Sequence, residues 1–359
     1  MPIRVLVPGT GARFRCGGLS VALQTARLLS QLRPTEVVTY RAREQSHPFL
    51  DDLLDREEAP GQALWLVSWG FDVPSLLKRL RGRPAVYQAH SSGYGFDLPP
   101  GVPIIAVSRN TLGYWGDRAP RNPLGLVPNA LEPQWIQRGA RHGRQVGGSD
   151  QRSIDVLVQQ RKSSPYVLNQ LVPALRAQGL RVEVQNGWVD DLVSLFNSAT
   201  VYLYDSAEYW RGRGVSEGFG LPPLEALACG CVVFTSFNHA LADLLTPGEG
   251  AHQIGQGSLQ TDLRRIRGAV DDPQAWLPNP DQLEGLLEQV SEARWLQLWS
   301  RALDWLDSLG CLQGLAPGLA RDLDPVLRSP STRRLRWRQR TQALRGKVVN
   351  RLPVWLQRG

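Results

Sequence analysis

The 359-residue sequence has four cysteines, one methionine, only three lysines and no long apolar run. Cys229 and Cys231 stand one residue apart, which fits neither the CxxC spacing of a zinc site nor a disulfide framework. We therefore expect them, with Cys16 and Cys311, to be small buried side chains in a reducing compartment. No segment offers the roughly 18 uncharged apolar residues of a spanning helix, and no secretory signal is recognisable. These absences predict a cytoplasmic protein.

The positive charge of the chain is concentrated at one end. Of the net +8, residues 328–359 contribute nine Arg and one Lys without any acid, so the preceding part is nearly neutral. A nearly neutral body argues against a protein-wide nucleic-acid surface. Within the tail, apolar positions from Trp337 to Trp355 follow helical spacing beside a basic face, which is typical of a helix on an anionic membrane. A terminal helix docked on the body and non-specific nucleic-acid binding are the alternatives.

Apolar runs alternate with helical periodicity along both halves of the chain, which predicts an α/β protein with two parallel-sheet domains. We expect an N-terminal domain over 1–137, a linker over 138–152 that is rich in Arg and Gly, a second domain over 153–310, and a basic helical tail over 311–359. The expected strands are Ile3–Val7, Glu36–Tyr40, Ala63–Ser68, Ala85–Ala89, Ile104–Ser108, Ile154–Val158, Arg181–Gln185, Val201–Tyr204 and Cys231–Thr235.

Helices are expected between most of these strands. The second half should carry them over Tyr166–Gln178, Asp191–Ser198, Pro222–Ala228 and Gln282–Leu309, with Asn238 capping a short helix over Ala240–Leu245 and a loop reaching Gly220. Gly230 suits the position just after the helix Pro222–Ala228. The first helix, after Gly17-Gly18, completes a strand–glycine loop–helix unit that is typical of a Rossmann-like domain.

Two glutamates eight positions apart, Glu217 and Glu225, form the densest chemical signal. One stands in a glycine-containing loop and the other in the first turn of the helix that follows. The glycines would let backbone approach a ligand, carboxylates would accept hydrogen bonds from sugar hydroxyls, and a helix N-terminus would bind phosphate. As the alternative, Glu225 would only complement the helix dipole and Glu217 would be an ordinary loop acid.

The run from Glu217 through Gly218, Phe219, Gly220 and Leu221 to Glu225, Ala226, Ala228, Gly230 and Val233 resembles the E-x7-E motif of retaining GT-B glycosyltransferases, in particular glycosyltransferase family 4. Leu227 stands where Met is usual, and Cys231-Val232 replaces a residue–Pro pair. The resemblance implies two Rossmann-like domains facing across a cleft. It also implies that Glu217 binds hydroxyls of the donor sugar, that Glu225 binds the ribose of its nucleotide, and that Gly218, Phe219, Gly220 and Leu221 line the donor site.

Other segments follow the family's order. Gly17 and Gly18 stand where the family's loop approaches the donor phosphates. Arg161 and Lys162 follow the first strand of the second half, where the family places two cations that bind the leaving diphosphate. Here the two are adjacent, and adjacent side chains on an extended segment point to opposite faces, so Arg161 is the better candidate.

Three further elements could contribute to the site. His90 follows a strand where the family often carries a His near the donor sugar, although a lone His is also a common structural residue. Trp188 lies where the family seats the nucleotide base, with a place in the core as the alternative. The loop Tyr209–Gly214 suits sugar or phosphate contact, or is simply solvated.

Metal-dependent sugar transferases of the other major fold need a D-x-D on a loop after a strand. The only D-x-D of this sequence, Asp322-x-Asp324, lies towards the tail. We therefore expect no metal site and no cofactor beyond the nucleotide-sugar donor. The family resemblance implies transfer with retention, to a glycan or lipid-linked acceptor. The protein would be cytoplasmic, with the tail over 328–359 bringing it to the inner face of the membrane. The alternatives are a non-catalytic nucleotide-sugar-binding scaffold of the same fold and a sugar-nucleotide epimerase.

Overall fold

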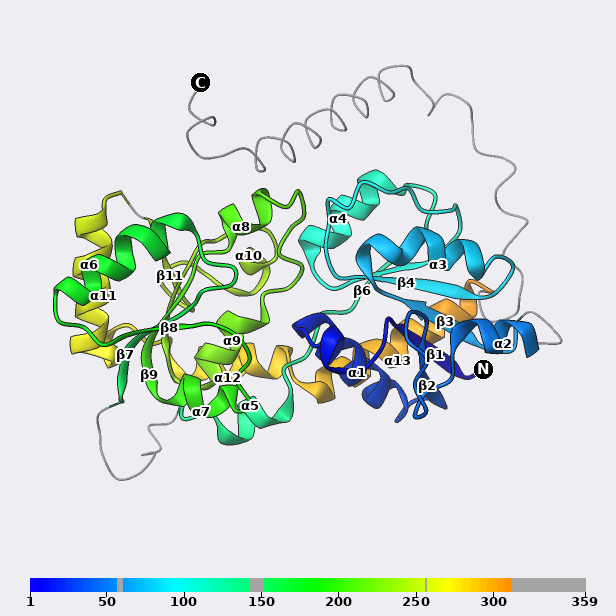
Figure 1. Ribbon diagram of the computed structural model, residues 1–359, viewed down its shortest axis with the longest axis horizontal. Coiled ribbons are helices and arrows are strands. Elements are labelled where there is room, and N and C mark those ends of the chain that lie inside the picture. Colours follow the sequence, from blue (N-terminus) through cyan, green and yellow to red (C-terminus); the bar gives the residue numbers. More distant parts are fainter. Residues whose placement is uncertain (57–60, 142–151, 256, 311–359) are drawn as a thin grey trace, which may run out of the picture.

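The computed structural model describes residues 1–56, 61–141, 152–255 and 257–310. They form two α/β domains that lie side by side, with the first at the right and the second at the left of Figure 1. The predicted basic helix over 328–359, Cys311, the Asp322-x-Asp324 pair and most of the predicted linker lie outside the described residues.

The first domain is built on a six-stranded sheet in the order β2-β1-β3-β4-β5-β6, and every pairing is parallel. Its strands are β1 (Ile3–Val7), β2 (Thr35–Thr39), β3 (Leu64–Val67), β4 (Ala85–Ala89), β5 (Ile104–Ala106) and β6 (Leu124–Leu126). The central strand β3 is buried along its whole length, as expected of a strand covered by helices on both faces. The predicted parallel sheet is confirmed, and the edge strand β6 is an addition to it.

Helices connect these strands on both faces of the sheet. They are η1 (Ala12–Phe14), α1 (Gly17–Leu29), α2 (Leu50–Arg56), η2 (Gly70–Asp72), α3 (Val73–Arg79), α4 (Arg109–Arg118) and, at the crossover to the second domain, α5 (Pro133–Arg138). Cys16 is the N-cap of α1, so the helix begins at Gly17. Ser108 caps α4 with its side chain, which accepts a hydrogen bond from the N–H of Thr111.

The second domain has a five-stranded parallel sheet in the order β11-β10-β9-β7-β8. Its strands are β7 (Ile154–Gln159), β8 (Val182–Gln185), β9 (Ala199–Tyr204), β10 (Val232–Thr235) and β11 (His252–Gln253). Its helices are η3 (Val167–Leu171), α6 (Val172–Ala177), α7 (Leu192–Asn197), α8 (Ala207–Arg211), α9 (Leu221–Ala228), α10 (Leu241–Leu244), α11 (Leu259–Asp271), η4 (Pro273–Ala275), α12 (Pro280–Gln289) and α13 (Glu292–Ser308).

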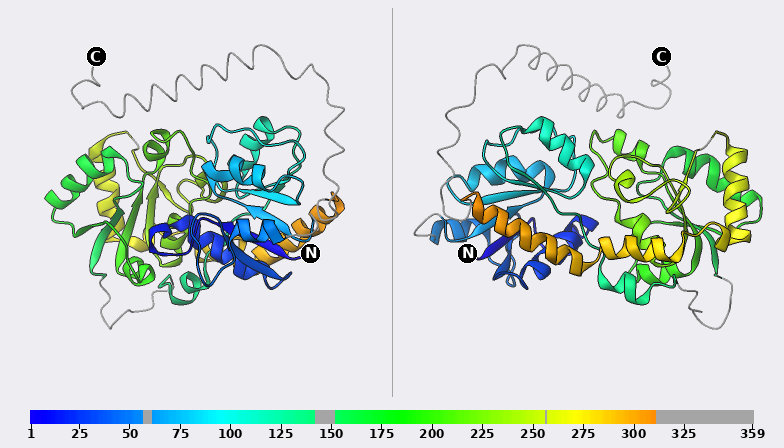
Figure 2. Two further views of the ribbon diagram at one scale, coloured as in Figure 1. Left: turned by 45° about the vertical axis from the view of Figure 1, so that its right-hand side comes forward. Right: turned by 180° about the vertical axis from the view of Figure 1, so that it is seen from behind.

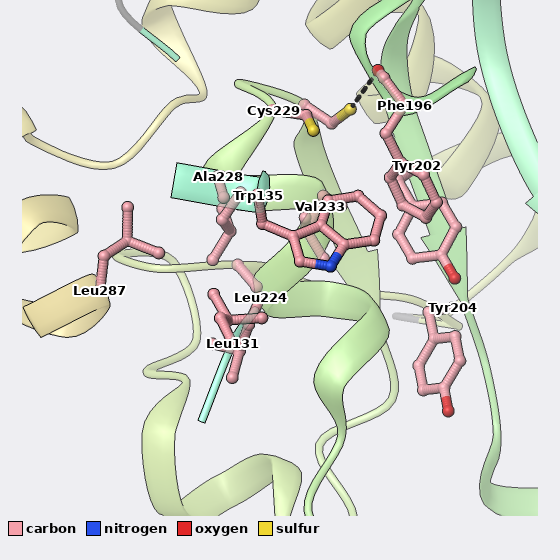
Figure 3. Packing of buried hydrophobic residues seen from close by; sticks show 14 of the residues in the cluster. Leu131, Trp135, Phe196, Tyr202, Tyr204, Leu224, Ala228, Cys229, Val233 and Leu287 are labelled. Atoms are coloured by element: carbon pink, nitrogen blue, oxygen red, sulfur yellow. Dashed lines mark hydrogen bonds between the residues drawn. The ribbon is translucent and has the colours of Figure 1, made fainter. Parts of the chain in front are cut away.

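One hydrophobic core contains residues of the crossover segment, of α9 and of the second sheet. Figure 3 shows Leu131 and Trp135 of the crossover packed beside Leu224 of α9 and near Tyr202 of β9. Cys229 and Cys231 are free thiols buried in this domain, and Cys16 is a half-buried free thiol in the first. Burial raises the pKa of the Cys231 thiol to about 11, so it behaves as a small apolar side chain.

Helix α13 returns from the second domain to the first. Trp295, Trp299, Leu303 and Leu306 pack in one buried cluster with residues of β1, β3 and β4. Seen from behind, α13 runs across the first domain (Figure 2). The predicted second domain, 153–310, thus includes a helix whose apolar face belongs to the core of the first.

Three local predictions differ from the structure. The single helix expected over Gln282–Leu309 is two helices, because Ser291 caps α13 and accepts a hydrogen bond from the N–H of Arg294. Ala240, not Asn238, is the N-cap of α10, and the Asn238 side chain instead bonds Ser236 and His239. The expected loop before Gly220 contains helix α8. No helix within the described ranges combines the length and the apolarity needed to cross a bilayer.

Candidate functional site

The candidate site lies where loops at the carboxyl ends of the two sheets meet. The Ser91 hydroxyl, after β4, donates a hydrogen bond to the carbonyl oxygen of Ser216 at 2.7 Å. The Ser92 N–H donates to the Ser216 hydroxyl oxygen at 3.2 Å. A Cβ placed on Gly218 would stand 1.5 Å from the His90 carbonyl oxygen. Gly218 therefore packs against the backbone of the other domain, and the motif loop begins at an interdomain contact.

Glu217 is buried and held by three side chains. Its Oε2 accepts hydrogen bonds from the Tyr204 hydroxyl at 2.5 Å and from the Trp210 indole N–H at 2.7 Å. Its Oε1 faces the Lys162 ammonium at 3.4 Å. Tyr204 lies at the edge of the labelled core residues, and its hydroxyl points away from them (Figure 3). Glu217 is only 4% exposed, and its carboxylate is satisfied by fixed donors, as a buried charge requires.

The two adjacent cations after β7 both contact side chains of the loop before the motif or of the motif itself. They stand in a turn, where Lys162 has a φ of +71°, and not on an extended segment. The Lys162 ammonium lies 5.0 Å from the centre of the Trp210 ring as well as beside Glu217. A hydrogen bond with Tyr209 raises the pKa of the Arg161 guanidinium, which therefore stays charged. The preference for Arg161 over Lys162 is not supported by these contacts.

Glu225 is the fifth residue of α9, one position further into the helix than predicted, because the helix already begins at Leu221. Burial, together with the negative charge of Glu132, raises the pKa of its carboxyl to about 8, and Lys162 opposes the shift. Within the described chain, no hydrogen bond to the Glu225 side chain is formed. A carboxyl group that is mostly neutral at pH 7 can both donate and accept a hydrogen bond, which suits a pair of ribose hydroxyls.

The residues between the two glutamates divide between core and loop. The Phe219 side chain is buried in the core of the second domain, so only its backbone can meet a ligand. Leu221 is half-buried against the same core. Gly220 has a φ of +93°, and a Cβ there would stand 2.2 Å from Leu241. The loop therefore needs glycine at 220 to turn into α9. Gly230 follows the last turn with a φ of +71°, as predicted.

The loop after β1 and the start of α1 approach the second domain, since Cys16 acts on the pKa of Arg161. No heavy atom lies within 4 Å of a Cβ placed on Gly17, and the nearest to Gly18 is the Cys16 sulfur at 3.7 Å. The Trp188 side chain of the second domain is 63% exposed and not in the core. The Arg15 guanidinium of the first domain lies 5.6 Å from the centre of its ring. The contact between Arg15 and Trp188 therefore brings this loop of the first domain against the second domain.

His90 is half-buried, and burial lowers the pKa of its imidazole to about 4. It is therefore neutral near pH 7. Its backbone carbonyl packs against Gly218, so the residue after β4 contributes to the interdomain contact whatever its side chain does.

An open cavity of about 560 Å³ lies beside the crossover. It is lined by α1 and by the N-cap and first residues of α5, namely Ser20, Leu23, Gln24, Arg27, Glu132, Pro133 and Gln134. Glu132 faces this cavity and also acts on the pKa of Glu225. No group of three or more His, Cys, Asp and Glu side chains in the described ranges is placed to share a metal ion.

Sequence reasoning missed Tyr204, Ser91, Ser92 and Glu132. Tyr204 is the last residue of β9, and a polar group at the carboxyl end of a parallel strand is a signal that could have identified it. The serines gave no such signal, because an interdomain hydrogen bond leaves no periodic pattern. Trp210 was noted only as part of a loop with an undecided role.

Known proteins resemble the chain in sequence over part of its length and in fold. The family model "Glycosyl transferases group 1" matches residues 178–275, which lie in the second domain. Among solved structures, Anabaena HepE in complex with UDP and glucose is 16% identical with a TM-score of 0.58, over 85% of this chain and 100% of that one. Sucrose-phosphate synthase from Thermosynechococcus elongatus is 14% identical with a TM-score of 0.60, over 86% and 99%.

A glycosyltransferase from Rickettsia africae is 9% identical with a TM-score of 0.61, over 86% of this chain and 98% of that one. No curated protein matches the sequence. The protein has the GT-B fold. The two facing Rossmann-like domains that the E-x7-E resemblance implied are thereby confirmed, and in this GT-B chain Glu217, Lys162 and Arg161 all lie on the second domain.

Proposed function

We propose that the protein transfers a sugar from a nucleoside diphosphate sugar to an acceptor hydroxyl. The observation that carries the proposal is the pairing of Glu217 with Lys162 at 3.4 Å, beside Arg161, at the carboxyl end of the second sheet. A fixed carboxylate can accept hydrogen bonds from sugar hydroxyls, and two cations can bind the diphosphate. The group 1 family match over residues 178–275 supports the same chemistry.

The residues suit a reaction in which charge develops on the leaving group. The bond between the anomeric carbon and the diphosphate oxygen breaks, and the diphosphate leaves with the electron pair. Arg161 and Lys162 would stabilise that charge without a metal ion. The acceptor oxygen would bond to the anomeric carbon on the same face, and its proton would pass to a diphosphate oxygen, so the sugar configuration would be retained. Glu225 would hold the ribose of the donor.

A panel of UDP-, GDP- and ADP-sugars tests the proposal through release of the nucleoside diphosphate. We expect one donor to be hydrolysed slowly and to be consumed faster with a suitable acceptor, with activity lost in Glu217→Ala and unaffected by EDTA. NMR of the product would then show a retained anomeric configuration. Tight donor binding without turnover would instead indicate a scaffold, and a changed sugar still attached to its nucleotide would indicate an epimerase.

We further propose a glycan or lipid-linked acceptor and peripheral membrane association of a cytoplasmic protein through residues 328–359. The nine Arg and one Lys of this segment, without any acid, support attraction to anionic lipid. Cosedimentation of the full chain with vesicles containing phosphatidylglycerol, compared with phosphatidylcholine alone, tests this part. Equal binding to both vesicles, or to neither, would contradict it.

A further inference from the structure

Helix α8 connects the anionic and the cationic side chains of the site. It lies between β9 and the loop that carries Glu217, in a segment outside the E-x7-E motif. Two adjacent residues of α8 contact opposite charges, because Trp210 donates to the Glu217 carboxylate and Tyr209 bonds the Arg161 guanidinium. Their rings also meet edge to face, with centroids 5.0 Å apart.

The two oxygens of Glu217 are not equivalent. Oε2 accepts short hydrogen bonds from two different elements, Tyr204 at the end of β9 and Trp210 on α8. Oε1 has only the longer contact of 3.4 Å with Lys162. Two donors on one oxygen fix the rotation of the carboxylate, and they leave Oε1 as the oxygen with capacity for a further hydrogen bond.

Trp210 acts on Lys162 by a separate interaction. The face of its indole ring lies 5.0 Å from the ammonium, and the Tyr204 ring lies 5.9 Å from it. An aromatic face attracts a cation and restricts where it can move. The indole therefore restrains the carboxylate through its N–H and the ammonium through its ring.

We propose that Trp210, together with Tyr204, is a positioning residue that turns Glu217 Oε1 towards the donor sugar and holds Lys162 at the diphosphate. This inference rests on the proposed function, since it assigns the sugar to Glu217 and the diphosphate to Lys162. In this assignment Trp210 acts through Glu217 and Lys162, and not by its own contact with the donor. Its two interactions can be removed one at a time, because phenylalanine keeps an aromatic face but has no N–H.

The test uses the full chain and two variants, Trp210→Phe and Trp210→Leu. The nucleotide sugar that raises the wild-type Tm most is chosen as the ligand. Calorimetry then measures the affinity of each protein for this nucleotide sugar and for the corresponding nucleoside diphosphate. Trp210→Phe should weaken nucleotide-sugar binding or lower kcat about tenfold or more, as expected for a lost hydrogen bond to a charged group. The same variant should bind the nucleoside diphosphate with an affinity within about twofold of wild type. Trp210→Leu, which also loses the aromatic face, should bind both ligands more weakly.

A double-mutant cycle with Glu217→Gln separates positioning from a general loss of structure. If Trp210 acts through the carboxylate, Trp210→Phe adds little to Glu217→Gln, and fully additive effects would overturn the proposal. Trp276→Phe is the matched control, because Trp276 packs on Phe234 and His252 on another part of the second domain and should leave both affinities unchanged. Tyr204→Phe provides a second route should Trp210→Phe unfold the loop.

The outcomes also distinguish this inference from the proposed function. A wild-type chain that binds a nucleotide sugar without transferring or hydrolysing it would contradict the proposed function. The positioning role would then be tested only by the affinities of the Trp210 variants for the nucleotide sugar and for the nucleoside diphosphate. A chain that binds no member of the donor panel contradicts both. Equal loss of sugar-nucleotide and diphosphate affinity in Trp210→Phe would overturn the positioning role while leaving transfer intact.

Discussion

Gly218 of the motif loop lies directly against the carbonyl oxygen of His90, which belongs to the other domain. A Cβ on Gly218 would stand 1.5 Å from that oxygen, far inside van der Waals contact. The beginning of the donor-site motif therefore depends on how closely the two domains approach each other. Backbone meets backbone at this point, so no side-chain rotation can relieve a clash.

Gly218→Ala should separate the two loops and lower the transfer rate by about tenfold or more, because about 1 Å of misplacement at a reacting site costs up to about 100-fold. The transfer assay and the radius of gyration from small-angle scattering check this result. Gly285→Ala is the control, since nothing lies within 4 Å of a Cβ at that helical position, and alanine there should raise the stability slightly. Wild-type activity together with unchanged scattering in Gly218→Ala would contradict the close contact.

Lys162→Ala should reduce activity more than Arg161→Ala does. Lys162 faces the buried Glu217 carboxylate, and its loss would leave that charge with fewer partners, whereas Arg161 is exposed and bonds Tyr209. We expect a loss of about 100-fold for Lys162→Ala, the scale of removing one group that stabilises developing charge. Steady-state kcat/KM with the preferred donor measures both variants. A larger loss in Arg161→Ala would restore the order predicted from the sequence.

Glu225 should make the protein less stable as the pH rises towards 8. Its pKa is about 8 in the folded state against 4.5 for an ordinary carboxyl, so between these values the folded state holds a proton that the unfolded state has lost. Stability therefore falls as pH rises through this window. Glu225→Gln removes this titration, so the variant should gain stability relative to wild type between pH 5 and 9 in urea unfolding. A constant difference across that range would contradict the raised pKa.

His90 should act in the opposite direction at lower pH. Burial lowers its pKa from 6.5 to about 4, so between these values the unfolded state binds the extra proton. Stability is thus lost as pH falls from about 6.5 to 4. His90→Gln should reduce this acid-dependent loss, which urea unfolding at pH 4 to 7 would detect. Retention of the full wild-type loss in the variant would show that His90 is not its source.

The strands could be predicted from the sequence where burial on both faces produces an apolar run, as in Leu64–Val67 and Val232–Thr235. The edge strands β6 and β11 could not. Leu124–Leu126 contains a glycine and is half-buried throughout, and His252–Gln253 has only two residues. Such strands are formed by pairing with a neighbour, and their own residues carry little periodic signal.

In the site, Glu217 and Glu225 could be located from the motif, but what surrounds them could not. The rule that adjacent side chains point apart failed at Lys162 because that residue adopts a positive φ, which non-glycine residues rarely do. Trp210 and Tyr204 approach Glu217 only after α8 and β9 are placed. The motif therefore identifies which chemical groups form the site, while the orientation of these groups depends on tertiary packing.

The packing of α13 has a consequence for how the chain acquires its structure during synthesis. The strands of the first sheet all precede residue 130 and are synthesised first. The core against this sheet is nevertheless completed by Trp295, Trp299, Leu303 and Leu306. A nascent first domain therefore lacks one wall of its interior until nearly the whole described chain has left the ribosome. The amino-terminal half should remain unable to reach full stability by itself until α13 arrives, so the two halves complete their folding together.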